Sequence, residues 1–346
     1  MTSLMYLKEL KLAELAVARA SKLTTLVFQN LVAASTVTKE DKSPVTVADF
    51  GAQAIVNAVL HQAFPQIPIV GEEDADALRQ DAAVSSKVWS LVSDVLSREA
   101  GTDDDGQGVG RIASQEDMLS AIDLGTFGGS PSGLMWALDP IDGTKGFLRG
   151  GQYAVCLGLI KDAKVVLGVI GCPNLPVDPA QPDGRKGLLF SAVTGCGAFS
   201  QPLDRSETER RISMNTLSST SEATFCESVE AGHSAHGTNH EIADRLGITR
   251  DSVRMDSQAK YCSIARGDGD IYLRLPVSDT YEEKIWDHAA GNVLITEAGG
   301  RVSDMYGQEL DFGKGRTLKS KGVIACEASI FDQVIAAVKE ASKPVL

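Results

Sequence analysis

The sequence predicts a layered fold of mixed α+β and α/β type, in which helices pack against sheets. Strand-like and helix-like segments mix along all 346 residues, with no internal repeat of the kind that builds solenoids. Several neighbouring strand candidates are linked by hairpin turns, which favours antiparallel pairing over a purely parallel sheet. Hydrophobic residues make up 43% of the chain, so it can bury a sizeable core. Its length corresponds to about two average domains.

The N-terminal part predicts two helices and a short strand. Apolar residues at spacings of three and four predict a helix over residues 9–33. Thr46 and Asp49 have the spacing of a capping box, so a second helix is expected from there to about Phe64. Two prolines stop that helix, and residues 67–70 are then expected to form a strand that leads into an acidic triplet.

The rest of the chain changes from helical to strand-rich character near Leu134. Helical pieces are expected around 84–97, within a stretch (75–133) that the sequence patterns otherwise leave undefined. Helices are expected near 239–246, 287–298 and 329–341. The expected strands cover residues 134–138, 154–160, 165–171, 188–193, 224–229, 270–275 and 322–326.

Charge and cysteine usage narrow the possible partners. The chain has 33 basic and 46 acidic residues and a net charge of -13, which argues against binding a nucleic-acid polymer or an anionic membrane surface. Its six cysteines contain no C-x-x-C pair and indicate reduced thiols rather than a disulfide framework or a zinc site. Without a signal-like or membrane-length apolar run, a cytoplasmic protein is the expectation.

The segment from Trp136 to Phe147 carries the strongest chemical signal. An apolar strand ends at Asp139, a proline then favours extended backbone, and Gly143 permits a tight turn. Asp139 and Asp142 can therefore converge, with the carbonyl of Ile141 between them and the hydroxyl of Thr144 beyond. These hard oxygen donors suit Mg²⁺. A plain surface turn is the alternative that either Asp-Pro or Asp-Gly alone would favour.

Other charged residues have both functional and structural interpretations. Glu72 lies in an acidic triplet that would ordinarily be a solvated turn. Asp287 precedes a helix that it could stabilise through the helix dipole, and Asp49 could act as a cap or in catalysis. The basic pair Lys145 and Arg149, next to the proposed metal turn, is interpreted as solvated surface charge.

Taken together, these motifs resemble the inositol monophosphatase superfamily of lithium-sensitive, Mg²⁺-dependent phosphomonoesterases. The resemblance rests on DPIDGT with a following Phe, on GEE upstream, and on WDHAAG with EAGG downstream. The segments DSQAKYC and YLRLP resemble the branch of 3′(2′),5′-bisphosphate nucleotidases of fungi and plants. The similarity extends from about Lys11 to Ala328 and is weakest at 75–133 and 178–222.

The resemblance implies a set of metal ligands and catalytic residues. One Mg²⁺ would bind Glu72, Asp139 and the Ile141 carbonyl, and a second would bind Asp139, Asp142 and Asp287. A third, looser ion would contact Glu72 mainly through water. The residues that orient and deprotonate the attacking water would be Asp49 and Thr144.

The resemblance also implies how the nucleotide binds and how the chain is divided. Lys260 and Arg274 can hold the phosphate that is not cleaved. The implied fold is an α/β/α/β/α sandwich, with an N-terminal part (1–165) carrying most metal ligands and a C-terminal part (166–346) carrying Asp287. The implied substrate-binding residues are Thr144, His233, Ser257, Lys260, Arg274 and Asp287.

The expected activity is hydrolysis of the 3′-phosphate of adenosine 3′,5′-bisphosphate to AMP and phosphate. Further expected substrates are 3′-phosphoadenylyl sulfate and some inositol polyphosphates, and the family context is sulfate assimilation and salt tolerance. We expect a monomer that Li⁺ inhibits, with Na⁺ as a second candidate inhibitor. Two alternatives are an enzyme resembling inositol polyphosphate 1-phosphatase and a non-catalytic nucleotide or metal sensor; the intact set of acids argues against the sensor.

Overall fold

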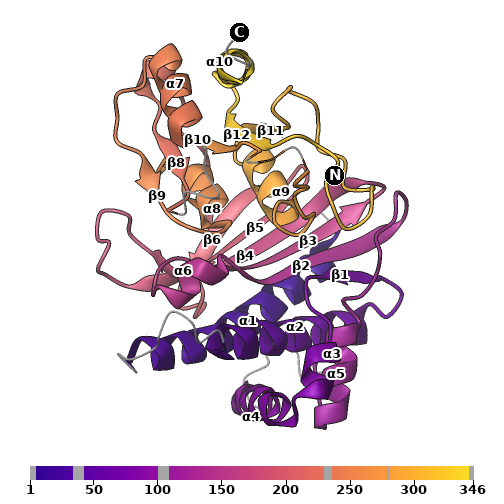
Figure 1. Cartoon of the computed structure of the whole chain (residues 1–346). Coiled ribbons are helices and arrows are strands. Elements are labelled where there is room, and N and C mark those ends of the chain that lie inside the picture. Colours follow the sequence, from indigo (N-terminus) through magenta and orange to yellow (C-terminus); the bar gives the residue numbers. More distant parts are fainter. Residues whose placement is uncertain are drawn as a thin grey trace.

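The computed structural model describes residues 5–33, 43–99, 109–229, 236–276, 278 and 280–342. In this part of the chain, five layers stack in the order helices, sheet, helices, sheet, helices (Figure 1). This arrangement confirms the expected α/β/α/β/α sandwich. Among the described residues, no helix has the length and apolar character that a membrane crossing requires.

The first layer consists of α1 (Leu7–Ala33) and α2 (Ser43–Ala63), which pack against each other and against the first sheet. The helix predicted over 9–33 is confirmed. The predicted capping box is wrong, because α2 begins at Ser43 and Thr46 and Asp49 lie inside it. A proline in the first turn does not prevent the earlier start, since the N–H groups there have no helical partner.

Three further helices cover the outer side of α1 and α2. They are α3 (Asp76–Gln80), α4 (Ala82–Glu99) and α5 (Gln115–Asp123), and they enclose a small apolar core with α2. The helix expected at 84–97 corresponds to α4. The other two were not predicted; they are short, with five residues in α3 and nine in α5.

The first sheet has seven strands, which pair in chain order. Only β1 and β2 run parallel, and all later neighbours are antiparallel. The predicted hairpin turn between β3 and β4 places Asp162 and Ala163 at positive φ, 49° and 65°, as in the tight turns whose twist matches that of the strands. The strands are β1 (Ile69–Gly71), β2 (Leu134–Asp142), β3 (Ala154–Lys161), β4 (Lys164–Pro176), β5 (Lys186–Val193), β6 (Gly197–Pro202) and β7 (Arg210–Ile212).

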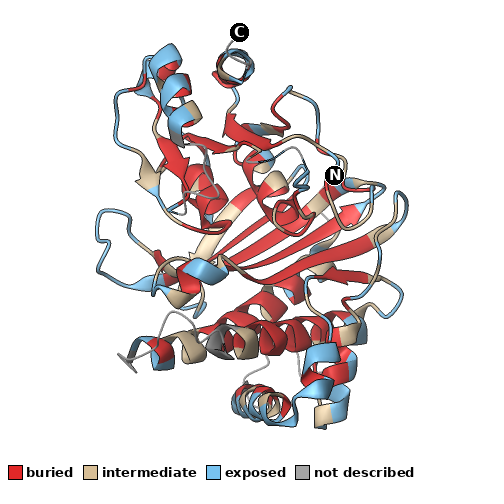
Figure 2. Cartoon of the chain, in the orientation of Figure 1, coloured by how far each residue is buried: buried red, intermediate tan, exposed pale blue. Residues whose placement is uncertain are grey.

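Both faces of this sheet are covered, which explains the nearly continuous apolar sequence of β2. Trp136 and Leu138 belong to the core shared with α1 and α2, whereas Met135 and Ala137 belong to the core on the opposite face. Alternate residues of a strand point to opposite faces, so a strand buried on both sides has no polar positions to alternate. Figure 2 shows the central strands of the sheet as almost entirely buried.

The second sheet has five strands in the order β11-β12-β10-β8-β9. Helices α8 (Ala259–Arg266) and α9 (Ala289–Glu297) lie between the two sheets, and α7 (His236–Leu246) and α10 (Phe331–Ala341) cover the outer face. The sequence patterns missed α8, β6, β7, β9 and β11. The strands of this sheet are β8 (Phe225–Glu227), β9 (Val253–Arg254), β10 (Ile271–Arg274), β11 (Gly300–Ser303) and β12 (Val323–Glu327).

The division of the chain after residue 165 stays a prediction. Val165 is the second residue of β4, in the middle of the first sheet. The chain passes from the first sheet to the second between β7 and β8.

Candidate active site

A cleft of ≈ 300 Å³ opens where the end of β2 meets α8, β10 and the segment that precedes α9. It gathers residues that are far apart in the sequence. His233 lies outside the described residues, and Asp49 does not line this cleft. The predicted site residues that line it are Glu72, Asp139, Ile141, Asp142, Thr144, Ser257, Lys260, Arg274 and Asp287.

An irregularity in β2 brings Asp139 and Asp142 to the same cleft. Residues three apart in a regular strand point to opposite faces. Here Asp139 pairs with Cys156, whereas Asp142 pairs with Ala154, so β2 carries one more residue than β3 between these pairs. A bulge of this kind redirects the following side chain, and both carboxylates therefore face the cleft.

The turn after β2 depends on Gly143. Its φ is +87°, a left-handed conformation that glycine adopts without strain, and a Cβ at this position would lie 2.8 Å from the Cβ of Ser257. The short helix α6 (Thr144–Leu148) follows directly. Thr144 is exposed at the cleft, and its hydroxyl donates to the carbonyl of Ile141 at 3.5 Å.

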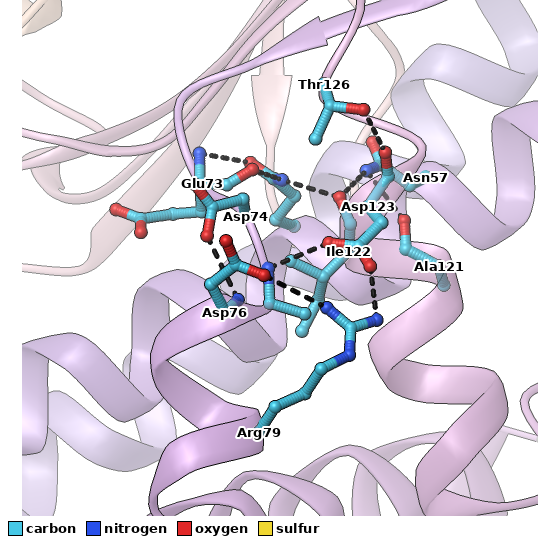
Figure 3. A network of polar contacts seen from close by, with 11 residues as sticks. Asn57, Glu73, Asp74, Asp76, Arg79, Ala121, Ile122, Asp123 and Thr126 are labelled. Atoms are coloured by element: carbon cyan, nitrogen blue, oxygen red, sulfur yellow. Dashed lines mark hydrogen bonds and ion pairs between the residues drawn. The ribbon is translucent and has the colours of Figure 1, made fainter.

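Helix α2 holds the acidic segment that follows β1 (Figure 3). The amide of Gln53 donates to the carbonyl of Glu73 at 2.6 Å and to that of Ile122 at 2.9 Å, and it accepts from the Glu73 N–H at 3.1 Å. Asp49 lies four residues earlier on α2, and hence on the same helix face. Burial, followed by the charges of Glu73 and Glu72, raises the pKa of Asp49 well above its usual range. Asp49 is thus close enough to this acidic segment to feel its charges, although it does not line the cleft itself.

Burial raises the pKa of all four acids assigned to metal, and neighbouring acids add to this effect for Glu72, Asp139 and Asp287. Part of Glu72 is open to solvent, yet burial by the cleft walls and the charges of Glu73 and Asp142 raise its pKa to about 7. Burial and the neighbouring acids also raise the pKa of Asp139 and Asp287. For Asp142 burial is again the largest cause, opposed by the charge of Lys260. Such a group of acids can be fully ionised only beside a cation.

The arrangement fits a divalent metal ion. Asp139 is 2% exposed, and its Oδ1 has no hydrogen-bond partner among the described residues. An unpaired buried carboxylate oxygen is costly unless a cation binds it. Carboxylates and a backbone carbonyl are also the oxygen ligands that Mg²⁺ prefers.

The closest cluster of potential ligand atoms differs from the predicted ligand sets. Among the described residues, Glu283, Asp287 and His288 form the group whose ligand atoms lie within 4.8 Å of one another. His288 is hydrogen-bonded through Nδ1 to the Tyr261 hydroxyl at 2.8 Å, and its Nε2 lies 3.4 Å from Glu283. Glu283 also accepts from Arg274. Glu283 and His288 thus have protein partners, and Asp287 is the member of the group that the sequence predicts as a ligand.

Helix α8 supplies a buried lysine opposite the acids. Lys260 is 4% exposed, and burial is the main reason that its pKa is lowered, although the charge of Asp142 opposes this effect. Its Nζ donates to the carbonyl of Ser257 at 2.9 Å. The N–H of Gln258 donates to the Asp142 carboxylate, and its side chain donates to the carbonyl of Trp286 at 2.8 Å. Sequence reasoning missed Gln258, although it lies within the DSQAKYC motif.

Arg274 ends β10 on the same side of the cleft as Lys260. Its Nε donates to Glu283 at 2.9 Å, and its guanidinium lies 5.8 Å from the ring centre of Tyr281. Burial alone would raise the pKa of Glu283, but the hydrogen bond and charge of His288 and the charge of Arg274 lower it to about 2. Sequence reasoning also missed Glu283 and His288, which stand on either side of Asp287 in the EKIWDHAAG motif.

Lys145 and Arg149 are both exposed, as expected, but Arg149 is not an isolated surface charge. Arg149 forms an ion pair with Asp256, which is 6% exposed and lines the cleft. The sequence could not reveal this pair, because its members are 107 residues apart and meet only when α6 packs near the segment before α8.

The chain matches the family model "Inositol monophosphatase family" over residues 7–343. It is 55% identical to the 3′(2′),5′-bisphosphate nucleotidase of Emericella nidulans, covering 98% of this chain and 99% of that protein. The protein of the same name from Schizosaccharomyces pombe is 54% identical, with 95% and 94% coverage. The one from Oryza sativa is 43% identical, with 98% and 95% coverage.

Solved structures support the fold. Mycobacterium tuberculosis SuhB matches with a TM-score of 0.59 at 21% identity and covers 97% of both chains. An inositol monophosphatase from Zymomonas mobilis matches with a TM-score of 0.62 at 18% identity, covering 97% of this chain and 99% of that one. From the fold, the cleft and the family match over nearly its whole length, this chain belongs to the inositol monophosphatase family.

Proposed function

We propose that this chain is a Mg²⁺-dependent phosphomonoesterase that hydrolyses the 3′-phosphate of adenosine 3′,5′-bisphosphate to AMP and phosphate. The observation that carries the proposal is the full-length similarity to relatives named 3′(2′),5′-bisphosphate nucleotidase. The composition of the cleft supports it, because the four acids assigned to metal line the same small volume as the basic residues Lys260 and Arg274. A bisphosphate needs both kinds of residue: the acids hold the metal at the phosphate that reacts, and the basic residues bind the phosphate that stays.

The residues that we assign to Mg²⁺ are Glu72, Asp139, Asp142, Asp287 and the carbonyl of Ile141, with two to three ions as the expected number. The unpaired Oδ1 of Asp139 supports this assignment. When bound, Mg²⁺ would lower the pKa of a water molecule and neutralise negative charge on the phosphate oxygens.

Asp49 and Thr144 are proposed to orient the attacking water and to accept its proton. Burial and the charges of Glu73 and Glu72 raise the pKa of Asp49, which makes its carboxylate a stronger base than an exposed one. The Thr144 hydroxyl is exposed at the cleft next to Ile141. In the reaction, the water oxygen bonds to phosphorus, the bond from phosphorus to the 3′-oxygen breaks, and the nucleoside oxygen takes a proton.

Lys260 and Arg274 are proposed to bind the phosphate that stays on the nucleotide, with Ser257 and His233 as further contacts. An arginine presents its donors in a fixed planar fork that matches phosphate oxygens, and a lysine adds a compact positive charge. An ion pair with Glu283 fixes the position of the Arg274 guanidinium. The same contacts would accept 3′-phosphoadenylyl sulfate.

A steady-state assay tests the proposal. Phosphate release from adenosine 3′,5′-bisphosphate should require Mg²⁺, exceed release from inositol 1,4-bisphosphate, and fall on addition of LiCl, with NaCl as the second ion to compare. Faster release from the inositol substrate would instead support an inositol polyphosphate phosphatase. Tight nucleotide binding without phosphate release from either substrate would support a sensor. The expected monomer in the cytoplasm remains a prediction for light scattering and cell fractionation.

A further inference from the structure

Arg316 contacts the residues that precede two acids of the cleft, Glu72 and Asp287. It lies in the segment between β11 and β12, yet its guanidinium reaches the end of the first sheet. It donates to the carbonyl of Gly71 at 2.6 Å and to the carbonyls of Gly125 and Phe127 at 3.2 Å each. Gly71 immediately precedes Glu72, so Arg316 holds the backbone from which this acid projects.

The same guanidinium packs on the residue that precedes Asp287. Its central carbon lies 4.8 Å from the ring centre of Trp286, which is 5% exposed. The backbone carbonyl of Arg316 also accepts from the N–H of Ile285 at 3.2 Å. One residue thus contacts both Gly71 and Trp286, each of which adjoins an acid of the cleft.

These contacts matter because nothing in the local sequence fixes the distance between Glu72 and Asp287. Glu72 follows a strand of the first sheet and Asp287 precedes a helix between the sheets. The charges of both acids raise the pKa of Asp139, and the charge of Glu72 also raises the pKa of Asp287. Repulsion between the two negatively charged carboxylates favours a larger distance between them. Ligands of one metal centre must nevertheless come close together.

We propose that Arg316 is a positioning residue that sets the separation of Glu72 and Asp287 and thereby the affinity of the cleft for divalent cations. The inference rests on the metal site of the proposed function. A guanidinium suits this role, because it can donate to several carbonyls in one plane while its face stacks on an indole. A lysine would keep the positive charge but lose this geometry.

The test compares Arg316→Lys with Arg301→Lys. Arg301 is a matched control, because its guanidinium also stacks on an aromatic ring, that of Phe331 at 3.8 Å, and it pairs with Asp332 away from the cleft. The measurement is Mn²⁺ binding to substrate-free protein, followed by the electron paramagnetic resonance signal of free Mn²⁺. Arg316→Lys should weaken binding by about 10–100-fold, as is typical of residues that orient metal ligands. Arg301→Lys should bind as the unchanged protein does.

Two variants of Trp286 separate this role from a general loss of stability. Trp286→Phe keeps a ring under the guanidinium and should change Mn²⁺ binding little, whereas Trp286→Leu should weaken it in the same direction as Arg316→Lys. In kinetics, Arg316→Lys should need more Mg²⁺ for half-maximal activity while the KM for nucleotide at saturating Mg²⁺ stays unchanged. Folded Arg316→Lys that binds Mn²⁺ normally would overturn the inference. The proposed hydrolysis would be untouched by that result, because it is measured on the unchanged chain.

Discussion

Asp139 shows how one residue can be costly for the fold and useful for the site. Its carboxyl group is almost fully buried, one oxygen has no hydrogen-bond partner among the described residues, and four other acids raise its pKa. A buried carboxyl group of this kind would destabilise an ordinary core, because its burial is unfavourable. Its presence at the end of a buried strand is therefore best explained by a bound cation.

Asp139→Asn should lower kcat by at least about 10²-fold, because it removes a charged metal ligand. The same change removes a source of repulsion, so we expect the variant to melt at a higher temperature than the unchanged chain in EDTA. Phosphate release and differential scanning fluorimetry provide the two readouts. Unchanged phosphate release would contradict the assignment of Asp139 to the metal.

Glu283→Gln tests whether Arg274 needs a charged partner. Glu283 is 4% exposed and accepts from Arg274, and loss of a charge-assisted hydrogen bond commonly costs about 1–2 kcal/mol. We expect the KM for adenosine 3′,5′-bisphosphate to rise by about tenfold, with a smaller change in kcat. Glu282→Gln is the control, since Glu282 pairs with Lys319 and Thr317 on the surface. Equal KM values for both variants would show that Arg274 is held without this charge.

At the scale of elements, β2 and α2 position the acids by different means. In β2 an extra residue between Asp139 and Asp142 turns both side chains to the cleft. In α2 the spacing of four places Asp49 and Gln53 on one face, and Gln53 then binds the backbone of Glu73. The sequence predicted the strand end, the glycine turn and a helix at these places. It did not predict the bulge or the Gln53 contacts, which depend on pairing with β3 and packing of α2 against the 122–125 segment.

The α2 contact can be tested with two neighbouring amides. Gln53 binds both Glu73 and Ile122, whereas Asn57, one turn later, donates to Ala121 and Ile122 and to no other described residue. Gln53→Leu and Asn57→Leu should each lower the free energy of unfolding by about 1–3 kcal/mol, because buried backbone groups lose their partners. Only Gln53→Leu should also raise the Mg²⁺ concentration for half-maximal activity. The same increase in Asn57→Leu would indicate a general loss of stability as its cause.

At the scale of the whole molecule, the cleft concentrates acids in a chain that is already acidic. The net charge is -13, and the acids that converge in the cleft come from segments as far apart as Glu72 and Asp287. Bound divalent ions would reverse the local sign of the charge, so a small bisphosphate can bind where a nucleic-acid polymer would be repelled.

This convergence predicts a pH dependence of stability. The pKa of Glu72 rises on folding from 4.5 to about 7. Between these values the folded chain retains a proton that the unfolded chain has lost, so stability without metal should fall as the pH rises through this range. Mg²⁺ binds the ionised carboxylates, and its stabilising effect should therefore be larger at about pH 8 than at about pH 5. Melting temperatures in EDTA and in MgCl₂, at equal ionic strength, test this. An equal gain from Mg²⁺ at both pH values would contradict it.

The sequence by itself determined the main elements, the glycine turn after Asp139 and nine of the nineteen residues that line the cleft. These follow from local properties: apolar periodicity, turn chemistry, and motifs whose members stand within a few residues of one another. Tertiary structure decided which distant residues meet. Three contacts join segments that are 20 to 245 residues apart. Arg149 pairs with Asp256, Gln53 hydrogen-bonds the backbone of Glu73, and Arg316 contacts both Gly71 and Trp286. Such contacts depend on how two sheets and their helices pack, which no local pattern encodes.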